Sequence, residues 1–136
     1  MAYPVLSNTA IDARDARALA EFYRELLGVR YRAGDEPPAP PQADDSDWIV
    51  LVDEQDHRVL AVQAEPDLRP STWPSEEVPM QMHMDFRVPD AAELETQRAR
   101  AEQLGARMLM DRSADPDEPL YVMGDPEGHP FCLLVG

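Results

Sequence analysis

The chain of 136 residues contains no lysine, because all twelve of its basic residues are arginines. The absence of lysine excludes reactions that need a lysine Schiff base, and it also excludes the Walker-type phosphate loop. A single cysteine, Cys132, excludes an internal disulfide and favours a reducing compartment. No apolar run is long enough to cross a bilayer and no leader pattern is evident, so a soluble cytoplasmic protein is expected.

Positive charge is scarce in this chain. The 27 acidic residues against 12 basic ones give a net charge of −15 at neutral pH. Such a surface repels phosphate backbones and anionic lipids, so neither nucleic acid nor a membrane is expected as a partner. The hydrophobic fraction of 43% and the length of one typical domain predict a folded core.

Two stretches of the chain have the same order of signals, which suggests two half-domains. In the first, a strand candidate over 6–12 leads to the helix cap Asp15, and the helix ends at Gly28. In the second, a strand candidate leads to the cap Asp90, and the helix ends at Gly105. A concave surface between such halves is a natural place for a ligand.

Three further strand candidates follow each helix, so each half is predicted to be β-α-β-β-β. These candidates are 29–32, 48–52, 58–64, 106–110, 120–123 and 131–135. The fold class is therefore α+β, with module 1 at about 5–65, a connector at about 66–80 and module 2 at about 81–136. The acidic, proline-rich stretch 33–47 is predicted to be a mobile loop.

The first strand of module 2 is predicted to have one polar face. Strand alternation places His83, Asp85 and Arg87 together on that face. The opposite face, toward the helix and core, receives Met82, Met84, Phe86 and Val88. His83 either fills a polar pocket or contacts a ligand as an acid–base group. Asp85 and Arg87 either pair with each other or line solvent, although a guanidinium there can also hold an anionic substrate.

Four other residues are candidates with simpler alternatives. Cys132 is expected to be a small, inert buried side chain rather than a nucleophile. Gln63 either orients a ligand or satisfies backbone groups. Trp48 and Trp73 are typical of core positions, but Trp73 lies among the prolines of the connector and also suits a pocket wall or a dimer contact.

The segments ALAEFYRELLGV, HMDFRVPD and DPEGHPFCLLV resemble the glyoxalase-like branch of the vicinal oxygen chelate (glyoxalase/bleomycin resistance/dioxygenase) superfamily. The resemblance covers nearly the whole chain and is strongest to uncharacterised, often bacterial, glyoxalase-like proteins. It implies a single glyoxalase-like domain over 1–136. Two tandem βαβββ modules would form an incompletely closed, curled mixed sheet, with the helices outside.

The resemblance also implies where a divalent metal would bind in metal-using members. The four implied ligand positions hold Asn8, Gln63, His83 and Cys132. Glyoxalase I-type sites use His and Glu, whereas three of these four residues are neither, and neutral amides are weak ligands for zinc or nickel. Other members, such as the bleomycin-resistance proteins, bind a drug without metal and work as dimers, so a homodimer is one expectation here.

Two functions follow from these observations, and the sequence does not decide whether the protein is an enzyme. The first is binding of a small molecule in the cavity between the modules, without a cofactor or a tightly bound catalytic metal. The alternative is a metal-dependent lyase, isomerase or dioxygenase that acts on a substrate with adjacent oxygens, with His83 as the catalytic residue. The predicted pocket residues are Asn8, Trp48, Gln63, Trp73, His83, Asp85, Arg87 and Cys132. A structural role would leave the cavity collapsed, and the polar face of the second module argues against that.

Overall fold

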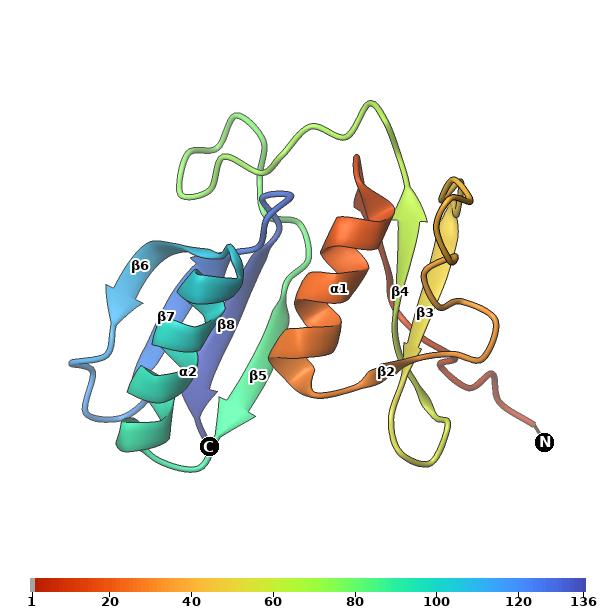
Figure 1. Cartoon of the computed structure of the whole chain (residues 1–136). Helices are drawn as coiled ribbons and strands as arrows, with labels where there is room; N and C mark the ends of the chain where they lie inside the picture. Colours follow the sequence, from red (N-terminus) through yellow and green to blue (C-terminus); the bar gives the residue numbers. More distant parts are fainter. Residues whose placement is uncertain (1) are drawn as a thin grey trace. The chain divides into compact units, whose positions relative to one another are not determined.

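The computed structural model describes residues 2–136, which form two compact units, 2–68 and Arg69–Gly136. Each unit has one helix and one four-stranded mixed sheet (Figure 1). The first unit comprises β1 (Ala10–Ala13), α1 (Ala16–Leu27), β2 (Arg30–Tyr31), β3 (Trp48–Val52) and β4 (Arg58–Ala64). The second comprises β5 (Met84–Val88), α2 (Ala91–Leu104), β6 (Arg107–Arg112), β7 (Leu120–Gly124) and β8 (Pro130–Val135). The predicted α+β class with tandem βαβββ modules is confirmed.

The first sheet has the strand order β1-β4-β3-β2, in which β1 is parallel to β4 and the other neighbours are antiparallel. Helix α1 begins where the Asp15 side chain accepts a hydrogen bond from the Ala18 N–H. It ends at Gly28, whose φ of 65° is left-handed and suits glycine. Its apolar stripe packs on β3 and β4 and buries Leu19, Ala20, Phe22, Tyr23 and Leu26.

The second sheet repeats this arrangement with the order β5-β8-β7-β6, in which β5 is parallel to β8. Helix α2 begins at Asp90, whose side chain accepts from the Glu93 N–H, and ends at Gly105. It covers one face of the sheet, and the Tyr121 hydroxyl of β7 donates a hydrogen bond to Glu95 of the helix on that face. Leu94 and Ala101 are its buried residues, so this helix is held by a narrower apolar stripe than α1.

Strand β5 confirms the predicted polar face, whereas the predicted apolar face is buried only in part. His83, Asp85 and Arg87 are exposed, Val88 is buried, and Met84 and Phe86 are half-buried. Met82, which was predicted to lie in the core, is 75% exposed, so that prediction is wrong. The reason is that β5 begins only at Met84, and the backbone before it turns, with the Met82 N–H donating to the Met80 carbonyl. The alternation of a strand does not extend into such a turn.

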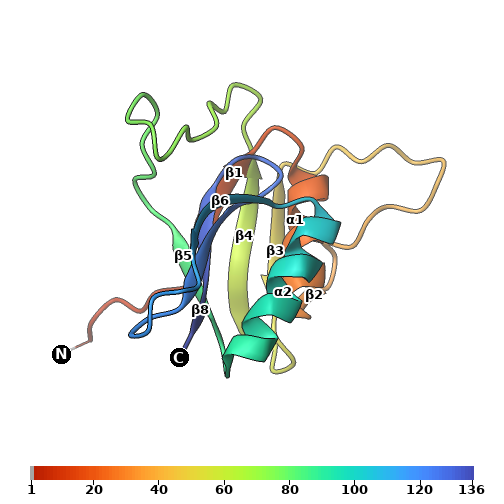
Figure 2. The same cartoon turned by 90° about the vertical axis from the view of Figure 1, so that its left-hand side faces the viewer.

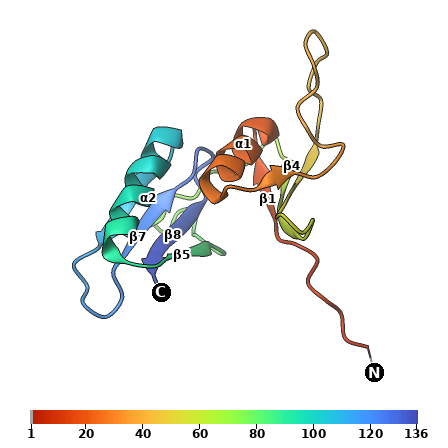
Figure 3. The same ribbon diagram turned by 60° about the horizontal axis from the view of Figure 1, so that its bottom comes forward.

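The chain before β1 also departs from the prediction. The strand expected over 6–12 begins only at Ala10. Residues 2–9 carry no regular structure, and the N-terminal part of this stretch extends away from the first sheet (Figure 3). Asn8 therefore precedes the strand instead of lying within it. Across the described residues, no helix is both long and apolar enough to pass through a membrane.

The acidic, proline-rich loop 33–47 projects from the first unit (Figure 2). The sequence predicts that it is mobile because it has little to bury. The structure adds an anchor for which the sequence contains no local signal: Arg17 of α1 hydrogen-bonds both ends of the loop.

Candidate functional site

Three potential metal-ligating side chains lie together at the edge of the second sheet. Asp85 of β5 is directly opposite Cys132 of the parallel strand β8, and His83 immediately precedes β5. The His83 Nε2 atom lies 3.3 Å from the Asp85 Oδ1 atom. One ligand atom from each of His83, Asp85 and Cys132 lies within 4.8 Å of the other two. We call these three residues the HDC cluster.

Burial differs within the HDC cluster. The Cys132 residue is 8% exposed, whereas the His83 and Asp85 side chains are 39% and 55% exposed. Burial of the thiol, together with the neighbouring Asp85 carboxylate, raises the pKa of Cys132 to about 11. The group is therefore a protonated thiol at neutral pH and a poor nucleophile, unless a bound cation displaces its proton.

The sheet face that carries the HDC cluster lies opposite α2. Strand register continues the row of Asp85 and Cys132 to Val122 and Met110. The next row consists of Arg87, Leu134, Leu120 and Arg112. Polar groups thus line the β5 edge, and an apolar floor lies beside them. Within residues 2–136, no hydrogen bond or ion pair holds the Arg87 guanidinium, whose stem packs near Gly136.

The structure places Asp85 against His83, which the sequence did not indicate. Alternation assigns a residue to a face, but it does not say which neighbour the side chain contacts. The contact between Asp85 and Cys132 depends on the pairing of β5 with β8, two strands far apart in the sequence. The sequence predicted Asp85 as a pocket residue, but it did not predict that Asp85 is a potential metal ligand.

In the first unit, two of the predicted metal positions are separated. The Asn8 side-chain oxygen accepts from Arg58 Nη1 at 3.1 Å, while Gln63 Nε2 donates to Asp12 Oδ1 at 3.0 Å. Register pairs Gln63 with Asp12, four residues beyond Asn8, which is about 13 Å along an extended chain. Asn8 and Gln63 thus have different partners in the first unit, and their shared role as metal ligands stays a prediction.

The two tryptophans lie in different settings. Trp48 pairs with Gln63 across the first sheet and is 37% exposed. Trp73 is half-buried in a turn of the second unit, where the Thr72 N–H donates to the Val78 carbonyl and the Trp73 N–H to Ser71 Oγ. Their roles as pocket walls stay predictions.

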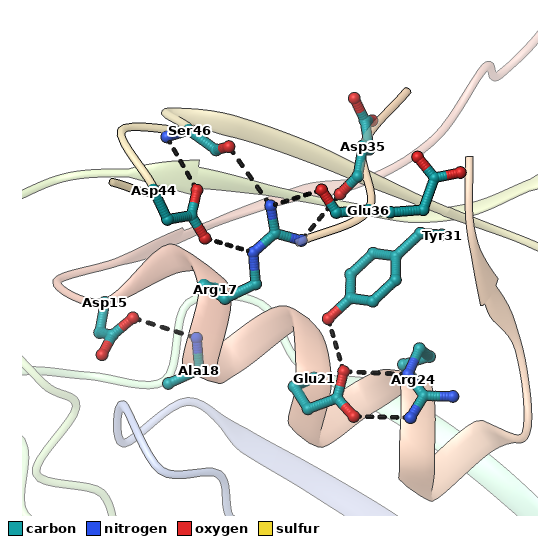
Figure 4. Close-up of polar contacts among 10 residues, drawn as sticks. All are labelled: Asp15, Arg17, Ala18, Glu21, Arg24, Tyr31, Asp35, Glu36, Asp44 and Ser46. Atoms are coloured by element: carbon teal, nitrogen blue, oxygen red, sulfur yellow. Dashed lines mark hydrogen bonds and ion pairs between the residues drawn. The ribbon is translucent and has the colours of Figure 1, made fainter. Parts of the chain in front are cut away.

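A second polar cluster, in the first unit, has no counterpart in the sequence predictions (Figure 4). The Tyr31 hydroxyl donates to Glu21 at 2.5 Å, and Glu21 also accepts from Arg24. The hydrogen bond from Arg24 is the main cause that lowers the pKa of Glu21 to about 2. An open cleft of about 460 Å³ lies beside this cluster and is lined by Glu21, Arg24, Arg30, Tyr31, Glu36 and Pro37. Its charged groups are engaged with one another, which is typical of a structural network.

Comparison with known proteins supports the fold and the resemblance. The model of the glyoxalase-like domain family matches residues 8–134. The chain belongs to this family. The fold is that of the vicinal oxygen chelate superfamily. A solved structure with this fold is a glyoxalase/bleomycin resistance protein/dioxygenase family enzyme from Burkholderia phytofirmans PsJN. It is 18% identical over 95% of this chain and 96% of its own, with a TM-score of 0.68. Among curated proteins, no significant relative was found.

Two fosfomycin resistance proteins named FosX also share the fold of this glyoxalase-like protein. The protein from Mesorhizobium loti is 18% identical over 100% of this chain and 94% of its own, with a TM-score of 0.65. The protein from Listeria monocytogenes is 15% identical over 99% of this chain and 93% of its own, with a TM-score of 0.69. At these identities the likeness concerns the fold alone.

The superfamily includes metal-using members, so the residues present must be tested for their fit to a metal. The HDC cluster offers a nitrogen, an oxygen and a sulfur donor, a combination that suits a borderline-soft cation such as zinc. The donors fit such a cation in number and type, whereas Asn8 and Gln63 add only amide groups that already make hydrogen bonds.

Proposed function

We propose that this glyoxalase-like protein binds a small molecule at the face of its second sheet opposite α2, with His83 as the central anchor. The observation that carries the proposal is the HDC cluster beside an apolar floor. His83 and Asp85 are exposed on the same face as the buried side chains of Cys132 and Val122. Such a combination of apolar surface with a few placed polar groups is what small-molecule sites use.

The chemistry of the face indicates the kind of molecule. An imidazole at the edge can accept or donate a hydrogen bond near neutral pH. The Arg87 guanidinium, two residues beyond Asp85 on the same face of β5, adds a donor for an oxygen-rich or anionic group. A compound with a polar, oxygen-bearing head and a compact apolar body would suit both parts of the face.

The named relatives support this class of ligand without identifying it. Solved structures with this fold include proteins described as fosfomycin resistance proteins and as members of the glyoxalase/bleomycin resistance/dioxygenase family. Those names refer to small molecules handled by those proteins. A fold can host many chemistries, so the compound bound by this chain must be found by experiment.

The HDC cluster also favours a second candidate, a metal-dependent lyase, isomerase or dioxygenase that acts on adjacent oxygens. His83, Asp85 and Cys132 would hold the metal. When bound, a divalent metal would polarise substrate oxygens as a Lewis acid. The chain's own part would be to position the metal, to orient a substrate head with Arg87, and to pack its apolar body on the sheet.

A thermal-shift screen tests the proposal. The probes are aromatic carboxylates, phosphonates and compounds with adjacent oxygens, and a compound that binds only the folded state raises the melting temperature. We expect His83→Ala to weaken binding of the best probe by at least about tenfold, or about 1.4 kcal/mol. The matched control is His57→Ala, because His57 is an exposed histidine of the first unit that also faces an aspartate.

The screen can contradict the proposal in two ways. Equal affinity of the wild type and His83→Ala for the best probe would show that the site is elsewhere. A best probe that loses affinity equally in His57→Ala would show a nonspecific effect. If His83→Ala fails to fold, His83→Gln keeps the side-chain volume and polarity and takes its place.

A further inference from the structure

We propose that the second unit alone binds one zinc-type divalent cation, through the imidazole of His83, the carboxylate of Asp85 and the thiolate of Cys132. This departs from the set implied by the resemblance, which takes ligands from both modules. The inference goes beyond the proposed function, because it depends on the three side chains and does not require a small molecule to bind.

The distances in the HDC cluster are close to those around a tetrahedral cation. Bonds of about 2.0–2.3 Å to nitrogen, oxygen and sulfur put neighbouring donors about 3.4–3.6 Å apart. The His83 and Asp85 atoms are already 3.3 Å apart, and every pair in the cluster lies within 4.8 Å. Side-chain rotations that move the donor atoms by about 1 Å are enough to bring the three donors to bonding distance from one ion.

The backbone fixes this arrangement. Asp85 and Cys132 face each other in the parallel pair of β5 and β8. The buried strand β8 holds the cysteine, while His83 precedes β5 by one residue and reaches back to Asp85. Two donors therefore lie on adjacent paired strands, and the third lies one residue before β5.

The first unit provides an internal comparison, because it has the same topology. The pair Asp85 and Cys132 corresponds to Ala10 and Ala61, which face each other in the parallel pair of β1 and β4. Asn8 and His83 stand equally far before the helix caps of their units. The counterpart of the HDC cluster is therefore one amide and two alanines, which cannot hold a metal.

The donor types select the kind of cation. A thiolate and an imidazole favour zinc and its spectroscopic substitute cobalt(II) over magnesium, calcium and manganese, which prefer oxygen ligands. Three protein ligands leave one position open, as in catalytic zinc sites. On binding, the metal–sulfur bond replaces the S–H bond of Cys132, and the proton passes to the solvent.

Titration of the chelator-treated protein with cobalt(II) tests the inference without any assay of activity. We expect a near-ultraviolet thiolate-to-cobalt absorption that saturates at one equivalent and disappears when zinc is added. Cys132→Ser should abolish this band, and Asp85→Asn and His83→Ala should each weaken cobalt binding by at least about tenfold. Circular dichroism shows whether each variant folds, and the Ser and Asn replacements nearly conserve volume.

Matched controls separate this site from the alternatives. Asp53→Asn should leave the titration unchanged, because Asp53 also faces a histidine but has no cysteine beside it. Asn8→Ala and Gln63→Ala should also have no effect. The inference is overturned if no thiolate band forms, if Asp85→Asn binds cobalt like the wild type, or if Gln63→Ala weakens binding. Cobalt binding without any hit in the small-molecule screen would support this inference and contradict the proposed function, and the reverse pattern would do the opposite.

Discussion

Asp85 is the residue whose position most changes the interpretation of this protein. Its carboxylate lies beside both the His83 imidazole and the Cys132 thiol. The resemblance implied only these two as metal ligands in the second unit, and the structure adds Asp85 as a third donor. The corresponding residue of the first unit is Ala10, whose side chain has no atom that could bind a metal. The two units thus differ at three corresponding positions: Asn8, Ala10 and Ala61 of the first stand where the second has His83, Asp85 and Cys132.

Gly128 allows a prediction about stability at the scale of one residue. It has a φ of 94°, and a Cβ atom at this position would lie 2.8 Å from the Pro70 Cβ atom. We expect Gly128→Ala to lower the free energy of unfolding by about 1–3 kcal/mol, from backbone strain and from the clash with Pro70. Urea denaturation measures the change.

Gly34→Ala is the control for the Gly128 prediction. Gly34 has a similar φ of 95°, but its Cβ atom would meet nothing within 4 Å. The control therefore isolates backbone strain from the clash. If Gly128→Ala proves no more destabilising than Gly34→Ala, the close approach of Pro70 does not matter for stability.

At the scale of the element, one arginine holds the loop 33–47. Arg17 Nε donates to Asp44 Oδ2 at 2.6 Å, and Nη1 donates to the Asp35 carbonyl at 2.7 Å (Figure 4). The Arg17 guanidinium also lies 5.0 Å from the centre of the Tyr31 ring. The two ends of a long loop are thereby tied to helix α1.

We expect Arg17→Ala to loosen this loop without unfolding the first unit. Hydrogen exchange over 33–47 should speed up severalfold, because the contacts that close the loop are lost. Arg107→Ala removes the same charge from an exposed position in the second unit and is the control. Exchange that is equally slow in Arg17→Ala and the wild type would show that the loop does not depend on this anchor.

The same loop should respond to acid. The Arg17 guanidinium is the main cause that lowers the pKa of Asp44 to about 2. Because the folded-state pKa is depressed, the ion pair stabilises the loop fully above the ordinary carboxyl pKa and is lost as pH falls through about 2. Protection of the loop amides, corrected for the pH dependence of intrinsic exchange, should therefore fall in this acid range in the wild type and depend less on pH in Arg17→Ala.

The sequence predicted elements where their signals are local. Asp15 and Gly28 mark the ends of α1, and the alternation of His83 and Asp85 marks the exposed face of β5, because caps and strand period involve near neighbours. Where turns interrupt the pattern, as at Met82, the prediction failed. The contacts of Arg17 with the loop and of Asp85 with Cys132 join distant segments, and no local pattern encodes them.

At the scale of the whole molecule, two units of one topology differ in chemistry. The second unit carries the HDC cluster, whereas the matching strands of the first unit carry two alanines and an amide. The fold could be predicted from the repeated pattern of elements, whereas the family came from the resemblance of segments such as HMDFRVPD and DPEGHPFCLLV. The uneven distribution of ligand groups became visible only through strand register.

The net charge of −15 sets the conditions for testing this account. Such a chain attracts divalent cations to many exposed carboxylates, weakly and without a fixed stoichiometry. A measurement that only detects bound metal would not separate this background from a site. The decisive measurement must report where the metal binds as well as how much.

The most direct measurement is therefore a titration of the isotope-labelled protein with zinc chloride, followed by amide NMR spectra. The account predicts that shifts concentrate at residues 83–86 and 131–133, saturate at one equivalent, and are lost in Cys132→Ser. Shifts that instead spread over the acidic loops at 35–47 and 113–118, and grow without saturation, would contradict a metal site in the second unit.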